Sequence, residues 1–269
     1  MKKVLMVLAM VLSLLFPYES TFAKTVDLTK DSNYQVIYKA LQSQKSKVKV
    51  KYNSRVFAVL HKVTEDHPEI FYIDYSKITL WTNGLLELGY TGSSKTINTQ
   101  IKQLNKKVNA ILKGAKSKKK KVDQIKYFHD YIVNHTKYDY VHYIKGKVPA
   151  NRYNAYGVLI KGTGVCQGYA DAMKLLLNKA KIPNYLVVGK AKSGHSWESH
   201  AWNLVKIGKS YYHVDTTWDD PITSNHKQVK RYNYFLLSDK EMSRDHKWDK
   251  TEYPKATSKA YSSYRKSLK

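Results

Sequence analysis

Residues 162–183 read GTGVCQGYADAMKLLLNKAKIP and contain Cys166, the single cysteine of the 269-residue chain. The glycines and threonine before the cysteine are typical of a turn. After it, apolar side chains at positions 170, 173, 176 and 177 share one helical face until Pro183 ends the pattern. The segment therefore predicts a helix that begins at Cys166. The N–H groups and dipole of a helix N-terminus favour the thiolate, which is the reactive form of cysteine.

Three stretches after this helix have the composition of β-strands. They are 185–188, 200–205 and 211–215, and the turn 207–210 joins the last two. In such a hairpin residue 200 pairs close to residue 215 or 216, so His200 and Asp215 are expected to be cross-strand neighbours. A carboxylate that holds one ring nitrogen of a histidine leaves the other nitrogen free to take a proton from a thiol. That is the arrangement of an activated nucleophile.

The N-terminal part of the chain carries the signals of a smaller region of helices and a hairpin sheet. Amphipathic helices are expected over 36–41, 56–63 and 97–112. Stretches rich in β-branched and aromatic residues cover 69–73, 78–81 and 85–90. Asn83 and Gly84 lie between the last two stretches, as in a hairpin turn.

Composition shifts along the chain divide it into four parts. Lysines and small residues dominate 114–121, and we place a domain boundary there. The parts are a signal peptide at 1–23, an N-terminal α/β accessory region at 24–115, a catalytic domain at 116–250 and a basic tail at 251–269. The tail has no apolar period and is expected to be loose.

The first residues have the pattern of a secretory signal. Lys2 and Lys3 precede an apolar run over 4–16, and small residues at 21 and 23 allow cleavage near Ala23. The run is shorter than the ~20 residues that a membrane span needs. We therefore expect a secreted or wall-associated protein without a transmembrane anchor after signal removal. A single cysteine excludes an intramolecular disulfide.

The composition indicates a folded and strongly basic protein. Hydrophobic residues make up 42% and aromatic residues 13%, which argues against disorder. Lys+Arg number 47 against 21 Asp+Glu, a formal net charge of +26, so an anionic cell-wall polymer is an expected partner. Only five of the cations are arginine, the residue that base and phosphate recognition favours, so no specific nucleic-acid binding is expected.

Several separated blocks of the sequence resemble the transglutaminase-like superfamily. They are 155–157 (AYG), 164–170 (GVCQGYA), 200–203 (HAWN) and 213–221 (HVDTTWDDP). The resemblance covers roughly 122–248 and preserves the family order of Cys, His and Asp. It implies an α+β fold of the papain-like, transglutaminase-core type, in which the nucleophile helix packs on an antiparallel sheet. Carried over residue by residue, Cys166 is the nucleophile, His200 the general base and then acid, and Asp215 the orienting residue.

The resemblance implies a cysteine acyltransferase or cysteine peptidase that acts on peptide or protein amides through a thioester. Hydrolysis is the favoured outcome, because nothing resembles the flanking β domains and calcium sites of animal transglutaminases. No cofactor and no metal are expected. Two alternatives stay open: a transglutaminase that crosslinks glutamine to lysine, and a non-catalytic basic protein that binds the cell wall.

Other polar residues near these blocks have simpler interpretations. A metal site formed by His213 with His200, Asp219 and Asp220 is a less favoured alternative. His195 lies in a polar loop and is expected at the surface. His246 resembles the end of the family's domain and is expected to be structural.

Overall fold

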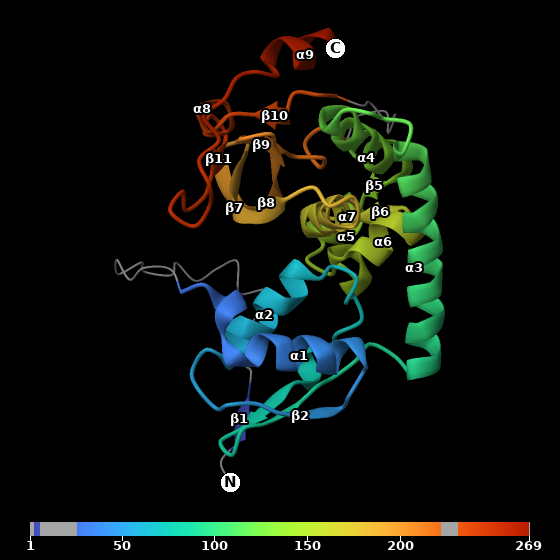
Figure 1. Cartoon of the computed structure of the whole chain (residues 1–269), viewed down its shortest axis with the longest axis vertical. Helices are drawn as coiled ribbons and strands as arrows, with labels where there is room; N and C mark the ends of the chain where they lie inside the picture. Colours follow the sequence, from blue (N-terminus) through green and yellow to red (C-terminus); the bar gives the residue numbers. More distant parts are fainter. Residues whose placement is uncertain (1–2, 6–25, 222–230, 269) are drawn as a thin grey trace. The chain divides into compact units, whose positions relative to one another are not determined.

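The computed structural model describes residues 3–5, 26–221 and 231–268 (Figure 1). The chain divides into two compact units, Met1–Ile101 and Lys102–Lys269. Most of the expected signal peptide 1–23 lies outside the described residues, apart from the strand β1, Lys3–Leu5. None of the helices within the described ranges combines the length and the apolarity that crossing a membrane requires.

The first unit packs two helices over a small antiparallel sheet. Its elements are η1 (Leu28–Lys30), α1 (Ser32–Gln42), β2 (Lys47–Lys49), α2 (Val56–Asp66), η2 (Tyr75–Lys77), β3 (Thr79–Trp81) and β4 (Leu85–Glu87). The sheet order is β1-β3-β4-β2. The expected turn joins β3 to β4, and Gly84 takes the positive φ of +81° that favours glycine there. The expected strand 69–73 is reduced to a single bridge between Ile73 and Tyr90.

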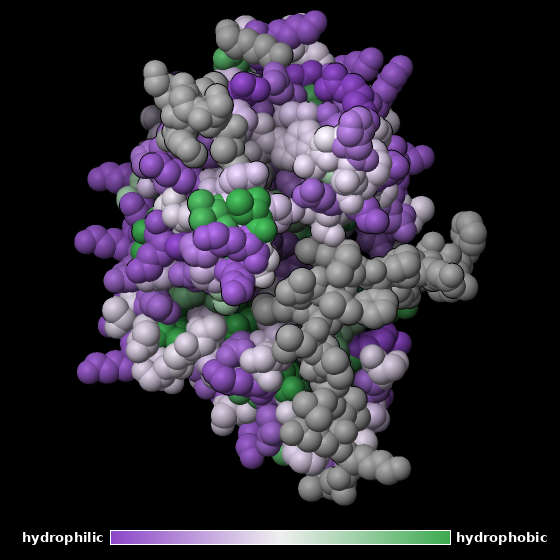
Figure 2. Space-filling model, turned by 180° about the vertical axis from the view of Figure 1, so that it is seen from behind, coloured by the Kyte–Doolittle hydropathy of each residue, from purple (hydrophilic) through white to green (hydrophobic). Residues whose placement is uncertain are grey.

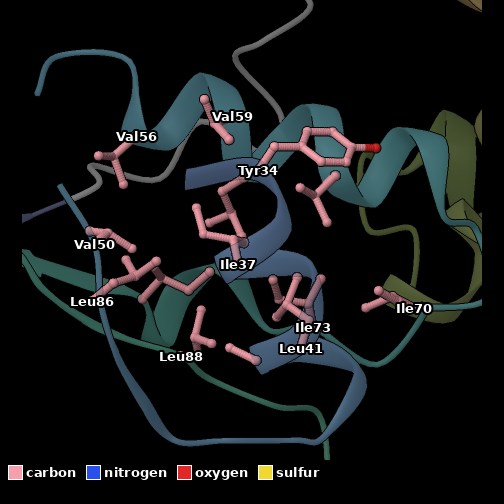
Figure 3. Close-up of a cluster of buried hydrophobic side chains, with 14 of the residues drawn as sticks. Tyr34, Ile37, Leu41, Val50, Val56, Val59, Ile70, Ile73, Leu86 and Leu88 are labelled. Atoms are coloured by element: carbon pink, nitrogen blue, oxygen red, sulfur yellow. The ribbon is translucent and has the colours of Figure 1, made fainter. Parts of the chain in front are cut away.

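The core of the first unit comes from the apolar faces that the sequence pattern marks. Ile37 and Leu41 of α1 and Val56 and Val59 of α2 are fully buried. Figure 3 shows these side chains in one cluster with Leu86 of β4. Burial of this cluster stabilises the unit by ~25 cal/mol per Å2 of apolar surface removed from water.

The second unit consists of helices and one larger antiparallel sheet. Its helices are α3 (Ser94–Ala115, which begins in the first unit), α4 (Lys121–His135), α5 (Tyr140–Ile144), η3 (Ala150–Tyr153), α6 (Ala155–Lys161), α7 (Cys166–Lys179), α8 (Asp239–Met242) and α9 (Ser262–Ser267). Its strands are β5 (Lys137–Tyr138), β6 (Thr163–Gly164), β7 (Asn184–Ser193), β8 (Ser196–Ile207), β9 (Ser210–Val214), β10 (Phe235–Leu237) and β11 (His246–Lys247). The five-stranded sheet has the order β10-β9-β8-β7-β11 with antiparallel neighbours.

Helix α7 packs on the sheet, as the expected α+β fold requires (Figure 1). Ala170 of α7 is buried against Leu186 of β7 and Ala201 of β8. The side-chain amide of Asn203 on β8 donates to the carbonyl of Ala170 at 3.0 Å. This contact fixes the nucleophile helix over the strand that carries His200. The α+β fold with its nucleophile helix on an antiparallel sheet is confirmed.

The β8–β9 hairpin turns at the expected residues, 207–210, but its register differs from the expected one. Ile207 pairs with Ser210, so only Gly208 and Lys209 form the loop, and Gly208 has φ +60°. The strand β9 ends at Val214, opposite Asn203. This register would place residue 200 opposite residue 217 and not 215 or 216. Asp215 therefore follows the strand and approaches His200 from the loop.

The C-terminal segment 251–268 packs on the second unit and does not form the loose tail that we expected. Ala256 is fully buried, and its backbone N–H donates to Asp239 at 3.0 Å. Arg265 of α9 is buried, pairs with Glu241 at 2.5 Å and donates to the carbonyl of Leu236 at 3.0 Å. These partners are distant in sequence, so no local pattern indicates them. The absence of an apolar period therefore led to the wrong prediction.

Candidate active site

The turn before α7 places Cys166 at the first residue of the helix. Val165 is the N-cap, with an extended backbone and no side-chain cap bond. Its N–H donates to the carbonyl of Arg152 at 3.0 Å. Cys166 is free and half-buried. The sulfur is therefore accessible beside helix N–H groups that no side chain caps, an arrangement that favours an anion.

The close approach of η3 to this helix requires glycine at position 168. A Cβ at Gly168 would lie 2.4 Å from the carbonyl oxygen of Arg152, which is backbone and cannot turn away. We expect Gly168→Ala to destabilise the protein by about 1–3 kcal/mol through overpacking. Denaturant unfolding measures this effect. Ala172→Gly in the same helix is the comparison, with an expected loss of about 1 kcal/mol from helix propensity together with a cavity contribution. An unchanged unfolding midpoint for Gly168→Ala would contradict this packing.

The structure joins His200 and Asp215 by a short hydrogen bond. The Nε2 atom of His200 lies 2.7 Å from Oδ2 of Asp215, and both residues are buried. The other carboxylate oxygen of Asp215 accepts the backbone N–H groups of Thr217 at 3.0 Å and Trp218 at 3.1 Å. A carboxylate that accepts this many bonds is held ionised and in one orientation.

Cys166 completes the group on the other side of the imidazole. Burial alone would lower the pKa of His200, but the charge and hydrogen bond of Asp215, then the hydrogen bond and charge of Cys166, raise it to about 10. Burial opposes ionisation of Asp215, whereas the charges and hydrogen bonds of His200 and His246 lower the pKa of that carboxyl. The structure therefore brings together the three side chains that the sequence singled out.

A second imidazole lies on the same carboxylate. His246 of β11 places Nε2 at 3.1 Å from Oδ2 of Asp215 and Nδ1 at 2.8 Å from Oδ1 of Asp245. The ring of Trp218 lies 4.5 Å from that of His246 and 6.0 Å from that of His200. Sequence reasoning did not connect His246 with the site. The one available signal was the adjacent Asp-His pair at 245–246.

Ligand atoms of His200, Asp215 and His246 lie within 4.8 Å of one another, a spacing that would also suit a metal ion. The two hydrogen bonds to Oδ2 of Asp215 account for this spacing without an ion. We therefore interpret the cluster as a hydrogen-bonded group. That no metal acts here stays a prediction.

The alternative metal set is not assembled. His213 accepts from Nε1 of Trp202 at 3.0 Å, and its Nε2 faces Asp239 at 2.9 Å. The other two carboxylates have separate partners as well: Asp219 bonds His129 at 3.0 Å, and Asp220 accepts from Tyr169 at 2.6 Å. His195 is exposed, as expected for a loop residue.

Cys166 and His200 open into a cleft of about 470 Å3. Aromatic and charged side chains line it: Tyr138, Tyr140, Tyr143, Lys192, Glu198, Trp218, Asp220, Arg231 and Tyr234. Two of these lining residues are joined by a hydrogen bond, in which the hydroxyl of Tyr143 donates to Glu198 at 2.6 Å. The mixture of aromatic walls and a few polar groups is typical of a ligand-binding site.

Tyr138 is fixed beside the nucleophile by a short parallel strand pair. Residue Tyr138 of β5 pairs with Gly164 of β6, two positions before Cys166. Burial and next the negative charge of Cys166 raise the pKa of the Tyr138 hydroxyl. The hydroxyl therefore stays protonated and available as a donor near the sulfur. Its sequence context gave no hint of this role, because the pairing of β5 with β6 is a tertiary contact.

Comparisons with known proteins find a family and solved structures that the chain resembles. Residues 105–216 match the family model of the transglutaminase-like superfamily. Among solved structures, the crystal structure of a TGase is 18% identical, with a TM-score of 0.40, over 68% of this chain and 52% of that chain. A candidate cysteine protease from Cytophaga hutchinsonii is 21% identical, with a TM-score of 0.36, over 48% of this chain and 41% of that chain.

The chain thus spans about half the length of these two structures or less. No curated protein matches the sequence. The matched segment contains Cys166 and His200 and ends just after Asp215, at residue 216. Over residues 105–216, the chain is similar to the transglutaminase-like superfamily.

Proposed function

We propose that this protein is a secreted thiol acyl-transfer enzyme that cleaves peptide or protein amides through a thioester on Cys166. The observation that supports it is the buried His200–Asp215 pair beside an accessible cysteine at a helix start, at the floor of a cleft. Its preferred acceptor is water, which makes it a peptidase or amidase.

In the proposed reaction, each residue of the triad acts both in the formation of the thioester and in its hydrolysis. The thiolate of Cys166 attacks the amide carbonyl, and the electron pair moves onto the carbonyl oxygen. His200 as imidazolium gives its proton to the leaving amine, the C–N bond breaks and a thioester forms. Neutral His200 then takes a proton from water, which attacks the thioester, and the acid is released with the thiolate restored. Asp215 holds the ring in place throughout.

The negative charge on the carbonyl oxygen needs hydrogen-bond donors. The backbone N–H of Cys166 at the start of α7 supplies one, and we assign the second to the hydroxyl of Tyr138, which shares the cleft with the sulfur. We expect Tyr138→Phe to lower kcat about a hundredfold with KM little changed. Steady-state kinetics on a peptide substrate measure the effect.

The matched variant is Tyr131→Phe, which removes a hydroxyl from α4 outside the set of cleft-lining residues. It should retain full activity. Equal kcat values for the Tyr138 and Tyr131 variants would rule out an oxyanion role for Tyr138.

The cleft is lined by two cationic and two anionic side chains, Lys192 and Arg231 against Glu198 and Asp220. Their charges balance, so they do not select between water and a lysine amine. The preference for water is the expectation drawn from the sequence. Crosslinking of glutamine to lysine is the alternative outcome of the same thioester.

The decisive experiment combines a glutamine-containing peptide with a labelled amine. Chain cleavage or ammonia release without amine incorporation supports the hydrolase, and incorporation supports the crosslinker. Cys166→Ala is the control and should abolish both. The wild-type thiol should react with iodoacetamide near pH 6, where an ordinary cysteine is mostly protonated. Absence of turnover together with ordinary thiol reactivity would leave only the non-catalytic alternative.

Secretion and attraction to an anionic cell wall form part of the proposal. The signal pattern at 1–23 and the formal charge of +26 support it. Hydrophilic residues project from much of the face seen in Figure 2. Wall binding driven by charge should fall steeply as salt rises. It should persist in Cys166→Ala, because it does not depend on the thiol.

A further inference from the structure

We propose that His246 is a positioning residue for the triad. It donates a hydrogen bond to the same oxygen of Asp215 that orients His200, and it places a positive charge next to that carboxylate. This inference rests on the proposed function, because it concerns the same triad. His246 lies beyond residue 216, where the family match ends, so the match does not imply it.

The hydrogen-bond partners of His246 require its ring to be positively charged. Both of its ring nitrogens face carboxylate oxygens, Nε2 at 3.1 Å from Asp215 and Nδ1 at 2.8 Å from Asp245. A carboxylate can only accept, so both nitrogens must donate and the ring is an imidazolium. Asp245 also accepts the hydroxyl of Tyr234 at 2.7 Å, which supports its acceptor role.

The surroundings of His246 come from several elements. Besides the two carboxylates, the titratable groups that face it are His200 of β8, with ring centroids 5.4 Å apart, Tyr234 before β10, also at 5.4 Å, and His213 of β9. The indole rings of Trp202 and Trp218 close the remaining sides at 5.1 and 4.5 Å. His246 itself is only 1% exposed. Its charge therefore acts on the triad with little screening by solvent.

Two consequences follow for His200. Oδ2 of Asp215 accepts a hydrogen bond from each of two imidazole rings. The two bonds together hold the carboxylate in one orientation. The positive charge of His246 opposes a second positive charge on His200, so that ring releases its proton to the leaving amine more easily than Asp215 alone would allow. A buried histidine with a purely structural role would stabilise the fold without affecting this proton transfer.

The test uses iodoacetamide, which reports the thiol–imidazole pair without any substrate. His246→Gln keeps one N–H for Asp215 and removes the charge, so the pH profile of Cys166 alkylation should move upward by about one unit. Turnover of a peptide substrate should fall about tenfold in kcat with KM unchanged. His246→Phe removes the donor as well and should lose more activity. His213→Gln is the control, because His213 is equally buried in the same sheet but bonds Trp202 and Asp239.

The outcomes separate this inference from the proposed function. If wild-type Cys166 alkylates like an ordinary thiol, the proposed function fails. If wild type is activated but His246→Gln and His213→Gln share its pH profile, the function stands and the positioning role is wrong. Should the His246 variants not fold, 15N spectra of the histidine rings in the full wild-type chain decide. Two protonated nitrogens on His246 support the inference, and one unprotonated nitrogen overturns it.

Discussion

Asp215→Asn should lower kcat/KM by about ten-thousandfold, as expected when the orienting carboxylate of a triad becomes an amide. Its two oxygens accept from four donors: His200 and His246 on Oδ2, and the N–H groups of Thr217 and Trp218 on Oδ1. An asparagine must point its NH2 group at one of these donor pairs. With the NH2 group toward Thr217 and Trp218, donors face a donor. With the NH2 group toward the rings, Nε2 of His200 must accept, and the tautomer then carries its proton on Nδ1 and cannot take one from the thiol.

The same substitution should destabilise the fold, because it leaves the two buried imidazoles without their common counter-charge. The expected loss is about 3–5 kcal/mol in the free energy of unfolding. Denaturant unfolding measures it, and kinetics on the folded fraction separate it from the loss of activity. Asp249→Asn, at a surface turn where Asp249 accepts from Thr251 at 2.9 Å, is the control and should match wild-type activity. Retention of more than a tenth of wild-type kcat/KM in Asp215→Asn would refute the orienting role.

His200→Gln should reduce kcat/KM by at least about a thousandfold, because the amide can neither take nor give the proton. Alkylation of Cys166 at pH 6 should slow to the rate of an ordinary thiol, since the imidazolium that stabilises the thiolate is gone. His195→Gln is the matched control in an exposed loop and should leave both rates unchanged. Rapid alkylation of the His200 variant at pH 6 would show that the helix start alone activates the sulfur.

The wild-type pH profile follows from the same ion pair. Because the pKa of His200 is raised to about 10, the imidazolium persists over most of the neutral and alkaline range, and activity should fall only as pH approaches about 10. The sign is the same for stability. A folded pKa above the unfolded value near 6.5 gives a contribution that is complete below pH ~6.5 and is lost as pH rises through about 10. The unfolding free energy of wild type minus that of His200→Gln, followed against pH, measures this contribution.

Local patterns were sufficient for the elements that carry the triad. The glycine-rich turn and the apolar period after Cys166 predicted the start of α7 correctly, because helix periodicity is read within one turn or two. The strand patterns around His200 and before Asp215 likewise predicted β8 and β9. Only the exact hairpin register was wrong. The turn is centred between Gly208 and Lys209, which places residue 200 opposite residue 217, one position beyond the expected partners.

The surroundings of the triad depend on contacts between distant segments, which no local pattern encodes. Tyr138 lines the same cleft as Cys166 because β5 pairs with β6. His246 reaches Asp215 across 31 positions of sequence, and Arg265 packs on Glu241 from a segment without apolar period. The sequence by itself predicted the start of the helix, the presence of the strands and the three residues proposed as the triad. Which further groups share the carboxylate and face the sulfur was decided only by the tertiary structure, because burial and hydrogen bonding depend on which surfaces meet after folding.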